Sequence, residues 1–158
     1  MSKKSQLAMG DFIVALVIAT LMLMVIMFTW NRYTIVLDEN TRFRNMESTA
    51  LQAADLLVKS PGSPIDWETD ISDIQIIGLA VTNRNISLNK LNSFANINYN
   101  RSLKLLGLEL YNFDFSFSYA NGTTISQHGK STNGTIININ RIVRFQNEDA
   151  TLKISVWK

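Results

Sequence analysis

The sequence predicts an α+β fold in which one long N-terminal helix packs on a small antiparallel β-sheet. The first observation behind this prediction is an apolar segment, residues 12–30, that contains no charge, proline or glycine. The second is a helical spacing of apolar residues that continues beyond it as far as Lys59. The third is a set of alternating apolar and polar residues in the C-terminal half, a pattern typical of strands that cover one face of a core.

The composition limits the classes of function. A length of 158 residues suits one membrane segment and one modest extracellular domain. The formal charge is +2, but Lys3 and Lys4 supply this excess, so the rest of the chain is neutral and shows no basic cluster for nucleic acid. With no cysteine and one histidine, the chain has no disulfide, no thiolate metal site and no multi-histidine site, and we expect no cofactor.

The apolar segment 12–30 is long enough to cross a bilayer. Its nineteen residues extend about 30 Å as a helix, which matches the hydrocarbon core. The lysines before it predict a single-pass anchor with a cytoplasmic N-terminus. Its small residues allow helices to approach closely, so it is interpreted as an assembly helix too, with an ordinary anchor as the alternative. The residues chosen as bundle or membrane contacts are Phe12, Ala15, Ala19, Leu23, Met27 and Trp30.

The helix is expected to continue past the apolar segment. Apolar residues recur at helical spacing from Phe43 to Leu57, and polar residues occupy the opposite face. The run Lys59-Ser60-Pro61-Gly62 supplies a cation in the last turn followed by helix breakers, which predicts the end of the helix. The sequence therefore divides into a basic leader (residues 1–6), a long assembly and transmembrane helix (7–60) and an extracellular β-rich domain (61–158).

Two short elements are expected at the start of the domain. Trp67 is predicted to pack a turn-rich linker onto the domain, and residues 74–80 are predicted to form a short strand. Leu88, Leu91 and Phe94 recur at a spacing of three, which indicates a short helix that Ser87 could cap. Residues 103–108 are expected to form a second helical or turn segment that ends at Gly107.

Three strands are predicted in the remainder. Residues 111–119 alternate between aromatic and polar side chains, and their aromatic face needs the long helix as its partner. Residues 137–145 alternate similarly, although Arg141 interrupts the apolar face, and residues 150–157 form the last strand. A polar loop that follows the first strand is expected to carry a solvent-exposed His128. Local connections between the strands indicate an antiparallel meander with one face on the helix.

The chain resembles a type IV pilin, specifically an archaeal pilin-like protein, in its basic leader, its acidic residue beside an apolar span and its amphipathic continuation. Residues 6–12, QLAMGDF, are similar to the archaeal class III leader pattern Gln-x-Ser-x-Glu-Phe, which a prepilin peptidase cuts before the Gln. Here Ala8 replaces the Ser, Asp11 replaces the Glu, and Gly10 adds one residue. The candidate cleavage region comprises Ser5, Gln6 and Leu7. Downstream segments 60–67, 86–91, 105–108 and 152–157 extend the resemblance over most of the chain.

The resemblance implies a structural subunit of an archaeal type IV pilus-like surface filament. Its helix would wait in membrane lipid until an assembly platform and a cytoplasmic ATPase lift it into a bundle with copies of itself or related pilins. The Asp11 carboxylate would then neutralise the N-terminal amine of a neighbouring subunit; alternatively, Asp11 is a helix N-cap in the headgroup region. The alternative function is a non-polymerising single-pass surface protein that presents a small binding domain.

No catalytic site is recognised in the sequence, and no enzyme activity is expected. Nucleophilic catalysis needs a base beside Ser or Cys, and the only histidine lies in a region rich in Ser, Thr and Gly. Residues 66–73 carry four acidic residues that could hold calcium, but their order does not match an EF-hand loop, so an exposed acidic segment is preferred. Four N-glycosylation motifs begin at Asn85, Asn100, Asn121 and Asn133.

Overall fold

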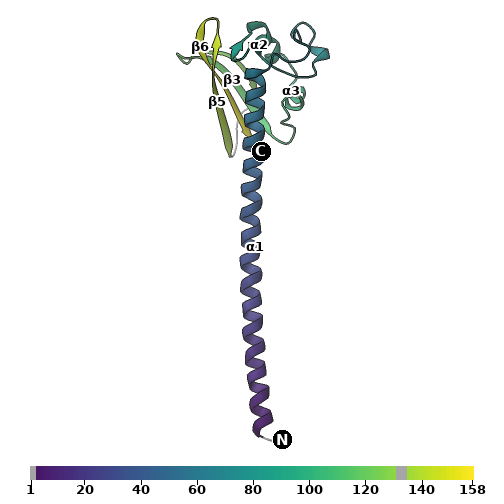
Figure 1. The fold of residues 1–158 in the computed structure, drawn as a ribbon, viewed down its shortest axis with the longest axis vertical. Helices are drawn as coiled ribbons and strands as arrows, with labels where there is room; N and C mark the ends of the chain where they lie inside the picture. Colours follow the sequence, from purple (N-terminus) through teal and green to yellow (C-terminus); the bar gives the residue numbers. More distant parts are fainter. Residues whose placement is uncertain (1–2, 131–134) are drawn as a thin grey trace. The chain divides into compact units, whose positions relative to one another are not determined.

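A computed structural model describes the backbone of residues 3–130 and 135–158, and the side chains from residue 10 onward within these ranges. The chain divides into two compact units, Met1–Phe43 and Arg44–Lys158. Helix α1 (Lys3–Lys59) is helical throughout and contributes to both units (Figure 1). The end expected at Lys59 is confirmed, and the helix begins four residues before the expected position.

The described residues of the first unit, 3–43, are entirely helical. Its threonine hydroxyls are satisfied within the helix: Thr20 Oγ1 donates to Leu16 O at 2.8 Å and Thr41 Oγ1 donates to Leu37 O at 2.8 Å. Thr29 makes the same kind of bond to Val25 O. Because the hydroxyls bond to the preceding turn, they do not require a polar partner outside the helix. The apolar segment therefore tolerates two threonines.

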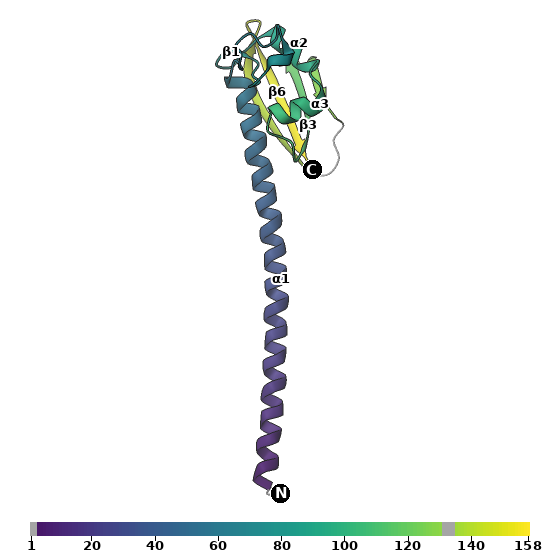
Figure 2. The same ribbon diagram turned by 90° about the vertical axis from the view of Figure 1, so that its right-hand side faces the viewer.

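The second unit contains a six-stranded sheet with helices on one face. The strand order is β1-β2-β5-β6-β3-β4, from β1 (Ala80–Thr82), β2 (Asn85–Ile86), β3 (Asn112–Tyr119), β4 (Thr124–Gly129), β5 (Ile136–Phe145) and β6 (Glu148–Trp157). Residues 44–59 of α1, with α2 (Leu88–Ala95) and α3 (Tyr99–Leu105), cover that face (Figures 1 and 2). The α+β class predicted from the sequence, a long helix packed on a small sheet, is confirmed.

The core lies between α1 and the sheet. Ala50, Ala53, Ala54 and Leu57 of α1 are almost completely buried, and so are the three phenylalanines of β3. The small alanines bring the helix close to the sheet, while Phe113, Phe115 and Phe117 fill the space beside it. The aromatic face of residues 111–119 thus packs as predicted. The ends of the run, Tyr111 and Tyr119, are only partly buried.

The hairpin between β5 and β6 follows from its turn residues. Gln146 and Asn147 have φ values of 50° and 69°, so both central residues of the two-residue turn are left-handed, the geometry of a type I′ turn. The strands on either side pair over ten residues each, from Ile136↔Trp157 to Phe145↔Glu148. The two predicted strands over residues 137–145 and 150–157 are confirmed.

The sheet is larger and more mixed than the predicted meander. A parallel contact joins β2 to β5 at Asn85↔Arg144, whereas the other pairs of strands are antiparallel. The strand predicted for residues 74–80 is wrong in its position, since β1 begins at Ala80 and residues 74–79 form no named strand. The physical reason is a different partner: Leu79 N donates to Leu57 O at the end of α1, so the backbone here caps the helix.

One further expectation is confirmed and two change in detail. The helix predicted near Ser87 is confirmed, because α2 begins at Leu88 and the Ser87 hydroxyl accepts a hydrogen bond from Lys90 N. The next helix, α3, ends at Leu105 and begins at Tyr99, earlier than the predicted segment 103–108, because Asn98 caps its N-terminus. The region predicted as a polar loop contains strand β4, which places His128 opposite Phe115. β4 lies at the edge of the sheet, and an edge strand can form although few of its residues are apolar.

The linker after α1 is held down by two buried side chains. Trp67 is fully buried, as predicted, and its Nε1 donates to Gly78 O at 2.9 Å. Lys90 is only 4% exposed, and its Nζ donates to Pro61 O at 2.5 Å and to Ile65 O at 2.6 Å. These bonds join the linker to α2 and to the segment before β1. Sequence reasoning anticipated the tryptophan and missed the lysine.

Gly78→Ala is expected to destabilise the globular unit by about 3 kcal/mol, because overpacking at a rigid contact forces the backbone to move. A Cβ at this position would lie 2.1 Å from Ser60 O and 2.7 Å from Gly62 N. Urea unfolding followed by near-ultraviolet circular dichroism measures the change. Gly10→Ala is the control, since nothing lies within 4 Å of its added Cβ. Equal stability of the two variants would contradict the packing.

Candidate functional site

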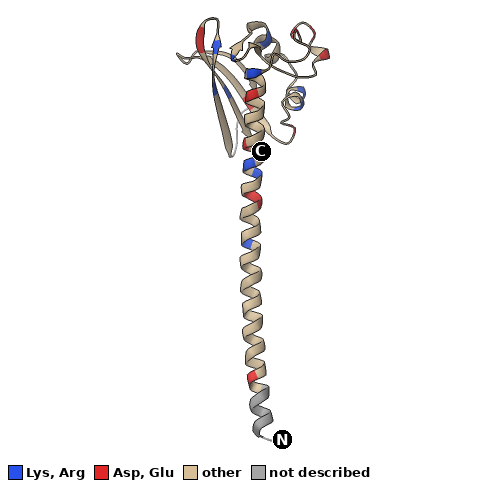
Figure 3. Ribbon diagram, viewed as in Figure 1, with Lys and Arg blue, Asp and Glu red and all other residues tan. Residues whose placement is uncertain are grey.

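The apolar part of α1 is exposed over its whole surface. The chosen contact residues Phe12, Leu23, Met27 and Trp30 leave 59–73% of their surface open, and Ala15 and Ala19 are exposed as well. No charged residue occurs between Asp11 and Arg32 (Figure 3). The segment is long and apolar enough to cross a membrane. Exposed apolar surface on this scale marks a site of contact with lipid or with protein.

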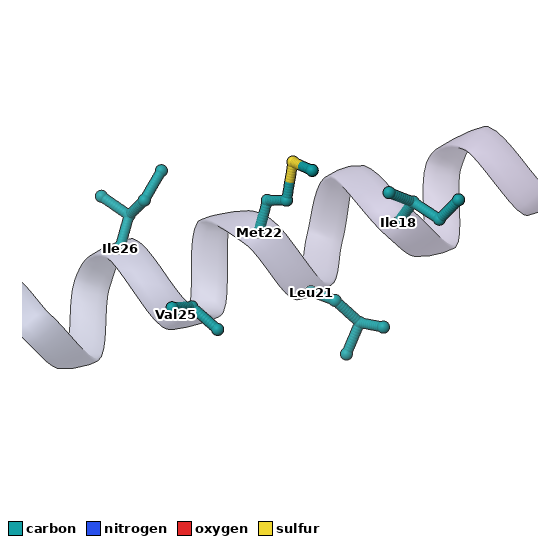
Figure 4. A pocket seen from close by; sticks show the side chains of 5 residues that line it. All are labelled: Ile18, Leu21, Met22, Val25 and Ile26. Atoms are coloured by element: carbon teal, nitrogen blue, oxygen red, sulfur yellow. The ribbon is translucent and has the colours of Figure 1, made fainter.

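The surface of this segment has shallow relief. Ile18, Met22 and Ile26 project from one side of the helix at a spacing of four, and Leu21 and Val25 project from a neighbouring side (Figure 4). The rows leave an apolar groove between them. Rows of side chains at this spacing are the ridges that fit between those of another helix. The helix therefore presents a surface that a second helix can pack against.

Asp11 is the acidic residue at the front of the apolar segment, and it is exposed. It lies inside α1, eight residues after the first helical residue, rather than at the N-cap position of the uncleaved chain. The backbone of the candidate cleavage region, Ser5, Gln6 and Leu7, is helical too, and its side chains lie outside the described part of the structure. The geometry therefore leaves the Asp11 carboxylate available to a partner and does not assign it to helix capping.

The glycosylation motifs occupy different environments. Asn121 is exposed in the turn between β3 and β4, and its Oδ1 accepts a hydrogen bond from Thr123 N at 2.9 Å. Asn85 is exposed on the short strand β2, and Asn100 is exposed in the first turn of α3. Asn133 lies outside the described residues. The placement of Asn121 leaves room for a glycan, and occupancy of these positions stays a prediction.

His128 differs from its prediction as an exposed loop residue. It is half-buried on β4, where its ring packs edge-on against Phe94 at 5.0 Å between centroids. Its Nε2 lies 2.9 Å from the hydroxyl of Ser102, which is fully buried on α3. The ring therefore joins α2 and α3 to the sheet. A buried serine beside an imidazole without a carboxylate partner among the described residues is better explained by packing than by nucleophilic catalysis.

Acid is expected to loosen this contact. Burial lowers the pKa of His128 below its ordinary value of 6.5, so the folded state disfavours the imidazolium. The resulting stability is complete above the unfolded-state pKa and is lost as the pH falls through 6.5 toward the folded-state pKa. We expect the thermal midpoint of the wild-type chain to fall more than that of His128→Gln between pH values of about 7.5 and about 5. Parallel curves for the two proteins would contradict this assignment.

The charges of the acidic segment 66–73 face solvent in part. Asp66, Asp70 and Asp73 are exposed, whereas Glu68 is partly buried, with its Oε2 3.9 Å from Lys90 Nζ. Hydrogen bonds from the hydroxyl and the backbone N–H of Ser72 lower the pKa of Asp70. Most of the segment is therefore an exposed acidic surface, as the sequence suggested.

An ion-pair network at the end of α1 was not anticipated from the sequence. Asp55 Oδ2 accepts from Lys59 Nζ at 2.7 Å, and Asp55 Oδ1 accepts from Arg141 Nε at 3.0 Å. The hydrogen bond from Lys59 and the charge of Arg141 hold the pKa of Asp55 below its ordinary value. Arg141 is the residue that interrupted the predicted apolar face of β5. Arg141, a charge within the apolar face of a predicted strand, was the signal available for this pairing, because Asp55 belongs to the polar face of the predicted helix.

Comparison of the chain with protein-family models, with curated proteins and with solved structures found no match. The layout itself is pilin-like, because a long N-terminal helix with an apolar first half packs its second half on a small sheet.

Proposed function

We propose that the chain is a structural subunit of an archaeal type IV pilus-like surface filament and assembles through its N-terminal helix. The observation that carries the proposal is the exposure of every residue of the apolar segment 12–30, on the same helix whose last turns contribute to the core of the globular unit. Such a surface requires lipid or other helices around it. The membrane supplies lipid before assembly, and the filament core supplies other helices afterwards.

Before assembly the subunit is held in the cell membrane by this helix, with its N-terminus in the cytoplasm and its β-rich unit outside. A prepilin peptidase removes the leader near Ser5, Gln6 and Leu7, and an assembly platform with its ATPase transfers the helix into the filament. Copies of this chain or related pilins then replace lipid around the apolar residues. Ridges such as Ile18, Met22 and Ile26 suit this exchange because they fit between the ridges of another helix.

Sequencing of the mature N-terminus and imaging of the cell surface test the proposal. We expect the native protein to begin within residues 6–8 and to occur in filaments visible by electron microscopy. A native protein that keeps its first methionine and stays dispersed in the membrane would instead identify a single-pass anchor with a small binding domain. Intact-mass measurement of the same sample tests the proposed glycans, of which Asn121 is the best placed.

A further inference from the structure

A polar cleft with excess positive charge lies in the globular unit beside the end of α1. Its volume is about 210 Å³, and its lining consists of Asp55, Val58, Lys59, Arg84 and Arg141. Three of these side chains are cations and one is an anion, so the cleft carries a net charge of +2. This cleft is separate from the apolar segment to which the proposed function assigns assembly.

The single carboxylate of the cleft is fully used. Asp55 Oδ2 pairs with Lys59 at 2.7 Å, and Asp55 Oδ1 pairs with Arg141 Nη2 at 2.9 Å. Arg141 uses Nε and Nη2 for this contact, which leaves donors on its Nη1. Within residues 10–130 and 135–158, the guanidinium of Arg84 makes no ion pair and no hydrogen bond. Donors of two guanidinium groups are therefore left for a ligand.

Capping of α1 does not explain the position of Arg84. Cations often lie near the C-terminus of a helix because its last carbonyls carry partial negative charge. Here those carbonyls already have backbone donors: Leu79 N donates to Leu57 O at 2.9 Å, and Arg84 N donates to Val58 O at 3.0 Å. Backbone groups just before β1 and in the turn after it thus perform the capping. The side chain of Arg84 is not needed for it.

The backbone at Arg84 is strained in a way that a glycine would relieve. Its φ is 64°, in the left-handed region that favours glycine and asparagine, and it lies in the turn between β1 and β2. Its carbonyl accepts from Arg144 N at 2.7 Å, so the turn is fixed to the sheet. A bulky cation is therefore held at the cleft at a cost in local stability. The turn itself would form at least as well with glycine, so the turn does not require the cation.

We propose that this cleft binds a small oxyanion with two negative charges, for which inorganic phosphate is the probe. The net charge of +2 in the cleft matches the charge of such a dianion. Guanidinium groups are suited to it because their planar donors bind two oxygens at once. Arg84 and Nη1 of Arg141 supply these donors, and Lys59 adds a further charge at the rim.

Calorimetric titration of the full-length protein in detergent with inorganic phosphate, at constant ionic strength, tests the site. We expect saturable binding of one phosphate per chain to the wild type. Arg84→Gly is expected to weaken the affinity about tenfold or more, because a charged hydrogen-bond donor is lost. The same variant is expected to keep or raise the thermal midpoint, because glycine suits the left-handed backbone. A merely structural role of Arg84 would lower that midpoint.

Lys104→Ala is the matched control, because it removes an exposed cation from α3, far along the chain from every residue of the cleft. We expect this variant to bind phosphate like the wild type. Absence of saturable heat with the wild type, or equal affinity in Arg84→Gly, overturns the proposal. Titration with acetate tests the charge match: binding as tight as that of phosphate would show that the site takes a single carboxylate and overturns the assignment to a dianion.

Discussion

Asp11→Ala is expected to reduce the amount of the chain found in filaments by about tenfold or more, while its level in the membrane stays unchanged. A carboxylate that enters an apolar bundle needs an opposite charge, and loss of one partner leaves the other buried alone at a cost of several kcal/mol. The exposed position of Asp11 within α1, next to the apolar segment, provides the carboxylate for such a pair. Quantitative blotting of sheared filaments and of membranes measures the two pools.

Two variants separate the charge of Asp11 from its other properties. Asp11→Glu keeps the charge and is expected to assemble, whereas Asp11→Asn keeps the hydrogen-bonding oxygen of a helix cap and is expected to fail. If Asp11→Asn entered filaments as the wild type does, the carboxylate would have no role as a charge. Assembly of Asp11→Ala at the wild-type level would remove the residue from the mechanism altogether.

Lys90→Met is expected to lower the free energy of unfolding of the globular unit by about 3 kcal/mol. The methionine matches the lysine stem in length, but it leaves Pro61 O and Ile65 O without their donor. It also leaves Glu68 Oε2, which already lacks a hydrogen bond, without the nearby cation at 3.9 Å. Acceptors that lose their hydrogen bond away from water cost about 1–3 kcal/mol each, and the partial exposure of the two carbonyls and the lower cost of burying an uncharged side chain offset part of this loss.

Urea unfolding monitored by tryptophan fluorescence measures this loss, since Trp67 lies in the same linker and is fully buried. Lys104→Met is the control, because it makes the same chemical change at an exposed position. We expect the control to change the free energy of unfolding by no more than about 0.5 kcal/mol. Equal stability of the two variants would mean that the lysine does not hold the linker.

The elements whose residues follow a regular pattern over many positions were predictable from the sequence. The end of α1 at Lys59, the aromatic strand β3 and the β5–β6 hairpin follow from spacing and from turn residues, since each pattern has one stable arrangement. The strand predicted over residues 74–80 was misplaced because the apolar character of residues 74–79 suits either a strand or a buried segment that caps a helix. Only the position of the α1 carbonyls decides between these, and that position is a property of the tertiary structure.

The candidate sites also fall into two groups, those that the sequence reveals and those that only the tertiary structure reveals. The apolar segment and Asp11 are visible in the sequence because they depend on neighbouring residues. His128, Arg84 and Lys90 depend on partners more than twenty residues away: Ser102, Val58 and Pro61. One signal was available for Lys90, which lies on the same face of α2 as Leu91 and Phe94 and is buried with them. A lysine on an apolar helix face indicates a buried set of acceptors.

Cross-linking of single cysteines in the apolar segment tests whether this helix forms the filament core, and the chain has no cysteine of its own to interfere. Leu23→Cys and Met27→Cys would each place one thiol on the exposed surface of the helix. We expect short bismaleimides to join neighbouring copies through these thiols in isolated filaments. As a control, a small thiol reagent must be able to label the cysteines in the filaments. If the labelled positions then yield only single chains after cross-linking, a core built from this helix is contradicted.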